Sequence, residues 1–370
     1  MRKPLTRGRV ICVFLIAALC VIMGVKVSSL FMVRQPVPGS VIAERRNGSA
    51  AYQSNANPVA VQETPQETVN LPVVSVPVFR PEQTLTGIPA DPWDILHYPV
   101  ESWRDRRFEL FSWDRFPEIL IMDIATKDIQ DRFFKRLAFF VEKAGFRGRL
   151  SFDEEIANLH GWNAHNYRAE DLANFFATAR RNNFPLLDEE WELEAILLSA
   201  GVLRRDSASR IIPGRGAILT LTRESDRALR SRFLVHEVFH GLFFIDADFR
   251  EFSLQRWEAL PEFAKRFLLV WFDVQAYDTE YEYLVINEFI GHVLQFPVAQ
   301  ASWYFGQHLP NRILAEDPRN IQALPAREEV RDGRRFWPDL ARVFTAEAEV
   351  FSRYVNERWD LEAGRVWRVR

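Results

Sequence analysis

The stretch FLVHEVFHGLF, residues 233–243, decides how this chain is interpreted, because it combines a helical apolar pattern with the motif H-E-x-x-H. Residues four apart lie on one face of a helix, so His236 and His240 can reach a single metal ion about 2.0–2.1 Å from each ring nitrogen. Glu237 would then lie beside that ion, where its carboxylate can take a proton from a metal-bound water. The motif therefore predicts a metal-binding helix that also carries a general base.

The residues around the motif favour a helix that is buried on several sides. Ser225 is the predicted N-cap, and Leu229 and Phe233 extend the stripe that holds the two histidines. Imidazoles inside a protein need polar partners, and one metal ion satisfies both rings. Two structural histidines satisfied by hydrogen bonds are the alternative interpretation of this pair.

A hydrolytic metal site needs a third protein ligand and a fourth position left open for water. Glu288 is the predicted third ligand, because it lies in YEYLVINEFIGHVLQF, residues 281–296, a helical pattern that is apolar nearly throughout. A carboxylate in so apolar a helix must be ligated or paired, since an isolated buried charge is costly. Thr279 and Glu282 are predicted to form the capping box that starts this helix, and Pro297 is predicted to stop it.

The sequence contains alternatives to Glu288 as the third ligand. An ion pair with an arginine is the alternative role for Glu288. The competing ligands would then be Asp246, Asp273 and Asp278. The metzincin arrangement needs a glycine where Phe243 stands and a methionine turn further on, but the last methionine is Met122. The sequence therefore excludes the metzincin arrangement.

These residues resemble the gluzincins, zinc metallopeptidases of the thermolysin type. The resemblance is specific at residues 236–240, moderate at Asn287-Glu288, and absent outside residues 216–295. It implies a zincin-like catalytic domain in which one Zn²⁺ ion is bound by His236, His240 and Glu288, with Glu237 as general base and then proton shuttle. Gluzincins of this type carry an aspartate four residues after the glutamate ligand, where it orients one histidine. Here that residue is His292, whose neutral imidazole can accept the same hydrogen bond without supplying the negative charge.

The same resemblance suggests how a substrate would lie. A strand just before the zinc helix would border the cleft, and residues 216–222 have the pattern of a strand. The substrate backbone would add along Ala217, Leu219 and Leu221, although an ordinary core strand is an equal alternative. Tyr281 is the favoured donor to the oxyanion because it shares the helical stripe of Glu288. The other candidate donors are Tyr283, Tyr304 and His308.

The N-terminal residues 1–34 are predicted to be a signal-anchor. Four basic residues precede an apolar run over residues 10–25, and apolar residues resume after Lys26. Basic residues stay on the cytoplasmic side of a membrane, so the rest of the chain is expected to be exported and tethered as a single-pass protein. Secretion after cleavage of a signal peptide is the alternative.

The remaining chain divides into a linker and one domain. Residues 35–90 are rich in Pro, Ser, Asn and Gln and are predicted to be a disordered tether. All 11 tryptophans and all 7 histidines lie within residues 91–370, which are predicted to form the globular domain. Its pattern is α+β and predominantly helical, with a small sheet. Strands are expected at residues 118–124 and 216–222, and helices at 127–144, 169–181, 188–200 and through most of the chain from 225 to 359.

Composition limits the possible functions of the 370-residue chain. A net charge of −3 gives no electrostatic case for binding nucleic acid. The only cysteines, Cys12 and Cys20, lie in the apolar N-terminal run, which excludes a disulfide framework and a cysteine zinc cluster from the domain.

The sequence thus predicts a membrane-tethered, exported zinc metallopeptidase that acts on peptide or protein substrates. The alternative is a non-catalytic cell-envelope protein that uses a peptidase-like scaffold for binding. Glu237 favours the enzyme, because a purely structural zinc site has no use for a general base.

Overall fold

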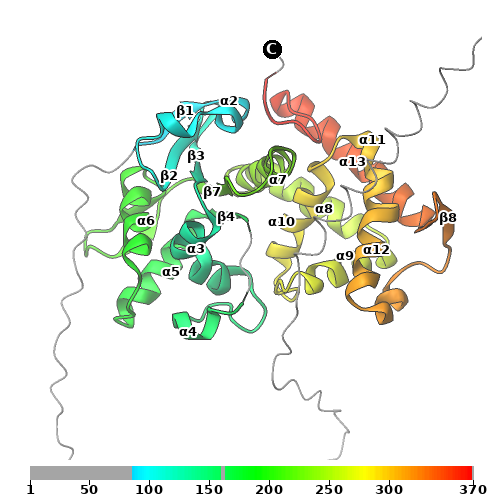
Figure 1. Cartoon of the computed structure of the whole chain (residues 1–370), viewed down its shortest axis with the longest axis horizontal. Coiled ribbons are helices and arrows are strands. Elements are labelled where there is room, and N and C mark those ends of the chain that lie inside the picture. The colour runs from blue at the N-terminus through cyan, green and yellow to red at the C-terminus, as the bar shows by residue number, and fades with distance from the viewer. Residues whose placement is uncertain (1–85, 160–162, 369–370) are drawn as a thin grey trace, which may run out of the picture. The chain divides into compact units, whose positions relative to one another are not determined.

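The computed structural model describes residues 86–159 and 163–368 (Figure 1). The predicted signal-anchor and nearly all of the predicted linker lie outside the described residues. Within the described ranges, no helix is both long enough and apolar enough to cross a membrane.

The described chain combines a small mixed sheet with a larger number of helices, which confirms an α+β fold that is predominantly helical (Figure 1). The strands are β1 (Ile88–Ala90), β2 (Phe108–Trp113), β3 (Phe116–Ile124), β4 (Ala164–Arg168), β5 (Leu203–Arg205), β6 (Ile211–Pro213), β7 (Ala217–Thr222), β8 (Glu329–Arg331) and β9 (Arg334–Phe336). The α-helices are α2 (Pro92–His97), α3 (Lys127–Glu142), α4 (Asp153–Ile156), α5 (Ala169–Arg181), α6 (Asp188–Ser199), α7 (Arg227–Ile245), α8 (Ala247–Ala259), α9 (Glu262–Val274), α10 (Glu282–Leu294), α11 (Val298–Trp303), α12 (Leu309–Glu316) and α13 (Pro338–Trp359). A π-helical turn over Tyr304–His308 joins α11 to α12, and 3₁₀ turns lie at Val100–Ser102 and Pro318–Ala323.

The main sheet has the strand order β1-β2-β3-β7-β4. β3 and β7 run parallel to each other, whereas β4 pairs antiparallel with β7 and forms one edge of the sheet. β1 pairs with β2 at the other edge, so the sheet already includes Ile88–Ala90, residues that the composition assigns to the linker. β4 was not expected from the sequence, and it becomes important at the candidate site.

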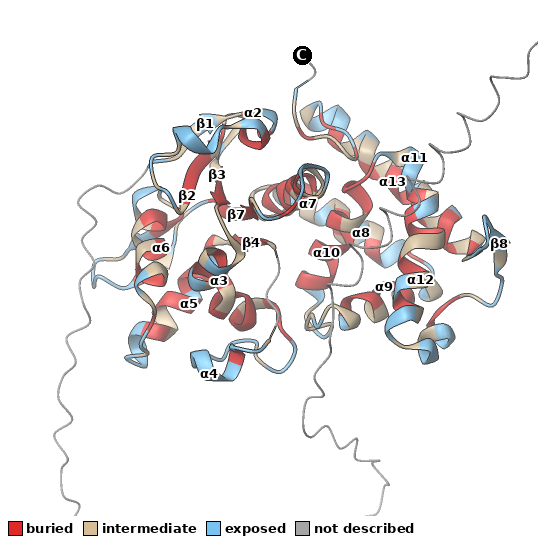
Figure 2. Ribbon diagram, viewed as in Figure 1, coloured by how far each residue is buried: buried red, intermediate tan, exposed pale blue. Residues whose placement is uncertain are grey.

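The sheet separates two hydrophobic cores, which explains why β3 is apolar on both faces. Ile119 and Ile121 pack into the core that contains α7 and α10, while Leu120 and Met122 face the core formed with α3, α5 and α6. Successive side chains of a strand point to opposite faces, so a strand buried on both sides reads as one apolar run. Figure 2 shows β2 and β7 as buried, in red, between these two groups of helices.

The predicted helices are observed, but two of their starting points differ from the prediction. α7 is capped by Asp226, whose carboxylate accepts a hydrogen bond from Leu229 N at 2.8 Å, and not by Ser225. α10 begins at Glu282 with Tyr281 as N-cap, so the predicted capping box of Thr279 and Glu282 is wrong. The physical reason is a turn at Asp278, whose side chain and carbonyl bind the backbone N–H groups of the residues just before the helix.

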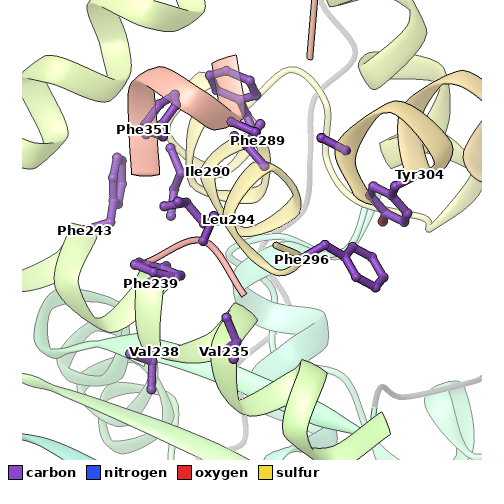
Figure 3. Close-up of a cluster of buried hydrophobic side chains, with 14 of the residues drawn as sticks. Val235, Val238, Phe239, Phe243, Phe289, Ile290, Leu294, Phe296, Tyr304 and Phe351 are labelled. Carbon is purple, nitrogen blue, oxygen red and sulfur yellow. The ribbon is translucent and has the colours of Figure 1, made fainter. Parts of the chain in front are cut away.

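α7 and α10 pack against each other, and this contact positions the candidate site. Apolar side chains from both helices meet others from α13 and the chain after α10 (Figure 3). The labelled members are Val235, Val238, Phe239, Phe243, Phe289, Ile290, Leu294, Phe296, Tyr304 and Phe351.

A buried ion pair ties the other side of α7 to the sheet. The Arg230 guanidinium lies 2.9 and 3.0 Å from the two carboxylate oxygens of Asp123 on β3, and Arg223 also contacts that carboxylate. α7 is therefore held between the sheet and α10.

Candidate metal centre

Two helices bring three metal-ligating side chains together. His236 and His240 project from one face of α7, and Glu288 projects toward them from α10. Nε2 of His236 lies 3.6 Å from Glu288 Oε2, and Nε2 of His240 lies 3.8 Å from Glu288 Oε1. The three donor atoms all lie within 4.8 Å of one another, as the ligand prediction requires.

The spacing and surroundings of these atoms fit a metal ion. Donor atoms about 2.0–2.1 Å from an ion at tetrahedral angles lie roughly 3.3 Å apart, close to the two observed separations. Nε2 of His240 and Oε2 of Glu288 are buried and have no hydrogen-bond partner within the described chain. Buried polar atoms are nearly always paired, so an ion between them would account for both.

Gly291 allows α10 to approach the two imidazoles closely. A Cβ atom at this position would lie 2.7 Å from Cε1 of both His236 and His240, and 2.8 Å from Nε2 of His240. Such distances are shorter than real Cβ contacts, so the arrangement requires glycine here. An isolated glycine inside an apolar helical pattern is the sequence signal that points to this close approach.

Glu237 lies beside the cluster and is hydrogen-bonded to a side chain of the sheet. Its side chain is buried, and Asn166 on β4 donates a hydrogen bond to Glu237 Oε2 at 2.9 Å. Asn166 in turn accepts a hydrogen bond from Asn287 at 3.3 Å. The sequence pattern does not single out Asn166, because β4 is short and its residues AHNYR carry little strand signal.

The charges around the site suit a cation. Burial lowers the pKa of His240 to about 4, and His236 adds to this effect, so the His240 imidazole is neutral at physiological pH. Burial alone would raise the pKa of Glu288, but the attraction between its carboxylate and the His240 and His236 rings is stronger and lowers the pKa to about 2. Burial raises the pKa of Glu237 to about 7. Burial alone would lower the pKa of His236, but its interactions with the carboxylates of Glu288 and Glu237 are stronger and raise the pKa.

The predicted orienting role of His292 is not observed. Trp271 Nε1 donates to His292 Nε2 at 3.2 Å, and His292 Nδ1 lies 2.6 Å from the Tyr304 hydroxyl and 2.9 Å from Gln295 Nε2. Both ring nitrogens are therefore used by neighbours other than the metal-ligand candidates. The His292 ring packs edge-on against His236, with centroids 5.2 Å apart, and it lies outside the three-residue cluster.

The predicted substrate-edge strand is wrong. β7 is paired with β3 on one side and with β4 on the other, so Ala217, Leu219 and Leu221 lie on an interior strand and not on an edge. All three are fully buried, and the two leucines belong to the core that contains α7. An uninterrupted apolar strand fits the interior of a sheet, and the free edge beside α7 belongs to β4.

The favoured oxyanion donor makes other contacts. The Tyr281 hydroxyl accepts a hydrogen bond from Arg168 at 2.9 Å, and the Arg147 guanidinium lies 3.5 Å from the Tyr281 ring centroid. No hydrogen bond joins Tyr281 to the three-residue cluster within the described residues, so this role stays a prediction.

The competing third ligands are occupied elsewhere or lie outside the cluster. Asp246 caps α8 and pairs with Arg358 at 2.7 Å, and Asp278 pairs with Arg147 at 3.6 Å. Asp273 is not part of the group that surrounds the histidines. Glu288 has no arginine partner in the described ranges, so the observed contacts favour a ligand over an ion pair.

Comparison of the chain with protein-family models, with curated proteins and with solved structures returns no match. The chemistry of the site therefore rests on its own donor atoms, burial and hydrogen bonds.

Proposed function

We propose that this protein is a zinc metallopeptidase of the gluzincin type that hydrolyses peptide bonds in peptide or protein substrates. One observation carries the proposal: two histidines and a glutamate converge from α7 and α10 while a second glutamate, Glu237, lies beside them. Two imidazole nitrogens and one carboxylate oxygen are a donor set that zinc binds in hydrolytic enzymes, with one position left for water or substrate.

The residues have separate roles in this proposal. Zinc bound there would supply a Lewis acid that polarises the scissile carbonyl and lowers the pKa of the attacking water. Glu237 accepts the proton of that water and delivers it to the leaving amine. Its Oε2 atom accepts a hydrogen bond from Asn166, which holds the carboxylate in place for this transfer.

A small cavity beside Asn166, the hydrogen-bond partner of Glu237, favours the alternative, a non-catalytic cell-envelope binding protein. The cavity is lined by Asn166, Asn287, Glu142 and Tyr281, among others, and holds about 20 Å³, room for one water molecule. Peptide hydrolysis therefore requires these lining segments to move apart when substrate binds. A closed site with His292 as fourth ligand would support the alternative, but both His292 nitrogens are already hydrogen-bonded.

We also propose that the domain is exported and held at the cell membrane by residues 1–34, or secreted if that segment is cleaved. The support is the order of basic and apolar residues in the sequence. The exported domain is expected to be periplasmic or otherwise extracytoplasmic. In cells with a permeabilised outer envelope and an intact cytoplasmic membrane, protease should degrade the domain while a cytoplasmic marker survives. Protection of the domain until the cells are lysed would contradict export.

The decisive experiment measures metal content and peptide hydrolysis on the full-length chain. Wild type should contain one zinc per chain and cleave members of an internally quenched peptide library. Glu237→Gln should keep the zinc and lose turnover, whereas Glu288→Gln should lose the zinc. Glu282→Gln, an exposed change on the same helix, is the matched control and should behave as wild type. Equal turnover in wild type and Glu237→Gln would eliminate the proposed mechanism.

A further inference from the structure

We infer that Asn166 is a positioning residue that fixes the carboxylate of Glu237 for proton transfer. This inference rests on the proposed function, because it assigns Asn166 a part in the same reaction. The observation is a chain of two hydrogen bonds, from Asn287 to Asn166 at 3.3 Å and from Asn166 to Glu237 at 2.9 Å.

The strand places Asn166 on the face of the sheet that carries α7. β4 pairs with β7 through residues 164–168, and side chains alternate along a strand. Tyr167 belongs to the core formed with α3, α5 and α6, on the other face of the sheet, and its hydroxyl lies 3.1 Å from His165 Nδ1. Asn166 faces the other way, where it reaches Glu237 on α7.

An amide is the group that this position needs. Its Nδ2 atom donates to the Glu237 carboxylate, while its Oδ1 atom accepts from Asn287, so both ends of the amide are held. An aspartate would offer no donor and would place a second negative charge beside Glu237. An aliphatic residue would leave a buried carboxylate oxygen without any partner.

The two hydrogen bonds of Asn166 also link the proposed general base to the helix that carries the third ligand. Asn287 directly precedes Glu288 on α10, so the same helix turn that presents the ligand also holds Asn166. A displacement of α10 would therefore move the ligand and the base together. Asn166 donates a hydrogen bond to Glu237, so its loss removes a restraint that keeps the carboxylate from adopting other rotamers.

The test compares steady-state kinetics of full-length wild type, Asn166→Ala and Asn166→Asp on the best-cleaved peptide of an internally quenched library. We expect kcat to fall about 10- to 100-fold in both variants, because a misplacement near 1 Å in a reacting group costs rates of this order. KM should stay within about twofold and zinc at one per chain. Asn174→Ala, an exposed change on α5, should leave both parameters unchanged.

A double-mutant cycle separates positioning from a general structural role. If Asn166 acts through Glu237, Asn166→Ala should not lower the slow residual turnover of Glu237→Gln any further, whereas a structural defect would lower it again. An unchanged kcat in Asn166→Ala, or additive losses in the cycle, overturns the inference and leaves the proposed function standing. A wild type that cleaves no library member overturns both. Should Asn166→Ala fail to fold, the isosteric Asn166→Asp decides the question by the same measures.

Discussion

Replacing Gly291 with alanine should weaken zinc binding while leaving the fold intact. Alanine in place of glycine inside a helix stabilises it by about 0.8–1.0 kcal/mol, so α10 itself should tolerate the change. The added methyl group would lie 2.7 Å from a ring carbon of His236 and of His240, and ordinary contact begins near 3.4 Å. Both imidazoles must therefore retreat by about 0.7 Å. Metal–ligand distances tolerate only about 0.2 Å, so the donor set cannot absorb that displacement.

The expected loss of zinc affinity is at least 10- to 100-fold, the range found when the support of a metal site is disturbed. This corresponds to roughly 1.4–2.8 kcal/mol of binding free energy. Competition with a chromophoric chelator measures the affinity, and thermal unfolding of the zinc-free protein measures the fold. The melting temperature of the zinc-free variant should stay within a few degrees of wild type, because the helix gain offsets the crowding.

Gly241→Ala is the matched control, since Gly241 also lies inside a buried helix, α7. Its added Cβ would lie 3.0 Å from Cδ1 of Ile119, a side-chain end that can shift, and its nearest contacts are all with Ile119. Gly241→Ala should change stability without changing zinc affinity. Wild-type affinity in Gly291→Ala would refute the reasoning, because the ion would then not lie between α7 and α10.

Three further predictions concern the parts that hold the site. Removing zinc with a chelator should lower the unfolding free energy by about 4 kcal/mol relative to the protein at a free zinc concentration near 1,000 times Kd. A melting temperature unaffected by chelator would contradict a bound ion. His292→Phe should keep the zinc content but lower the unfolding free energy in denaturant by about 1–3 kcal/mol. The reason is that the Trp271 N–H loses its acceptor and the Tyr304 hydroxyl loses a partner. Loss of zinc in this variant would instead make His292 a ligand. Arg230→Leu should lower the unfolding free energy by about 3–5 kcal/mol in the same assay, and by less if Arg223 still pairs with Asp123. The exposed Arg227→Ala should lower it far less. Equal effects would argue against the Arg230–Asp123 pair as the anchor of α7.

Local patterns in the sequence were sufficient to predict the helices and the cluster of His236, His240 and Glu288. The spacing of His236 and His240 defines a shared helical face, and the apolar surroundings of Glu288 require it to be ligated or paired, so these predictions depend on few distant residues. The same is true of β3, whose apolar run predicts a strand buried on both faces.

Other features depend on contacts that no local pattern contains. An apolar run does not reveal whether a strand lies at the edge or the centre of a sheet, which is why β7 was assigned to the edge. β4 exists because it pairs with β7 about fifty residues away, and Asn166 reaches Glu237 only through that pairing. The partners of His292 come from α9 and from the π-helical turn, two segments that are separate from α10 in the sequence.

Helix packing, more than the ligands themselves, sets the spacing of the candidate site. α7 is anchored to β3 by Arg230 and packs on α10 through a broad apolar contact (Figure 3). α10 is held in turn by His292, whose hydrogen bonds reach α9 and the π-helical turn. These supports hold the two helices at positions where the ligand atoms lie 3.6 and 3.8 Å apart. A site organised in this way should bind zinc without folding around it, so the chelated protein should still unfold in one cooperative transition, unlike small zinc domains that unfold when the metal is removed.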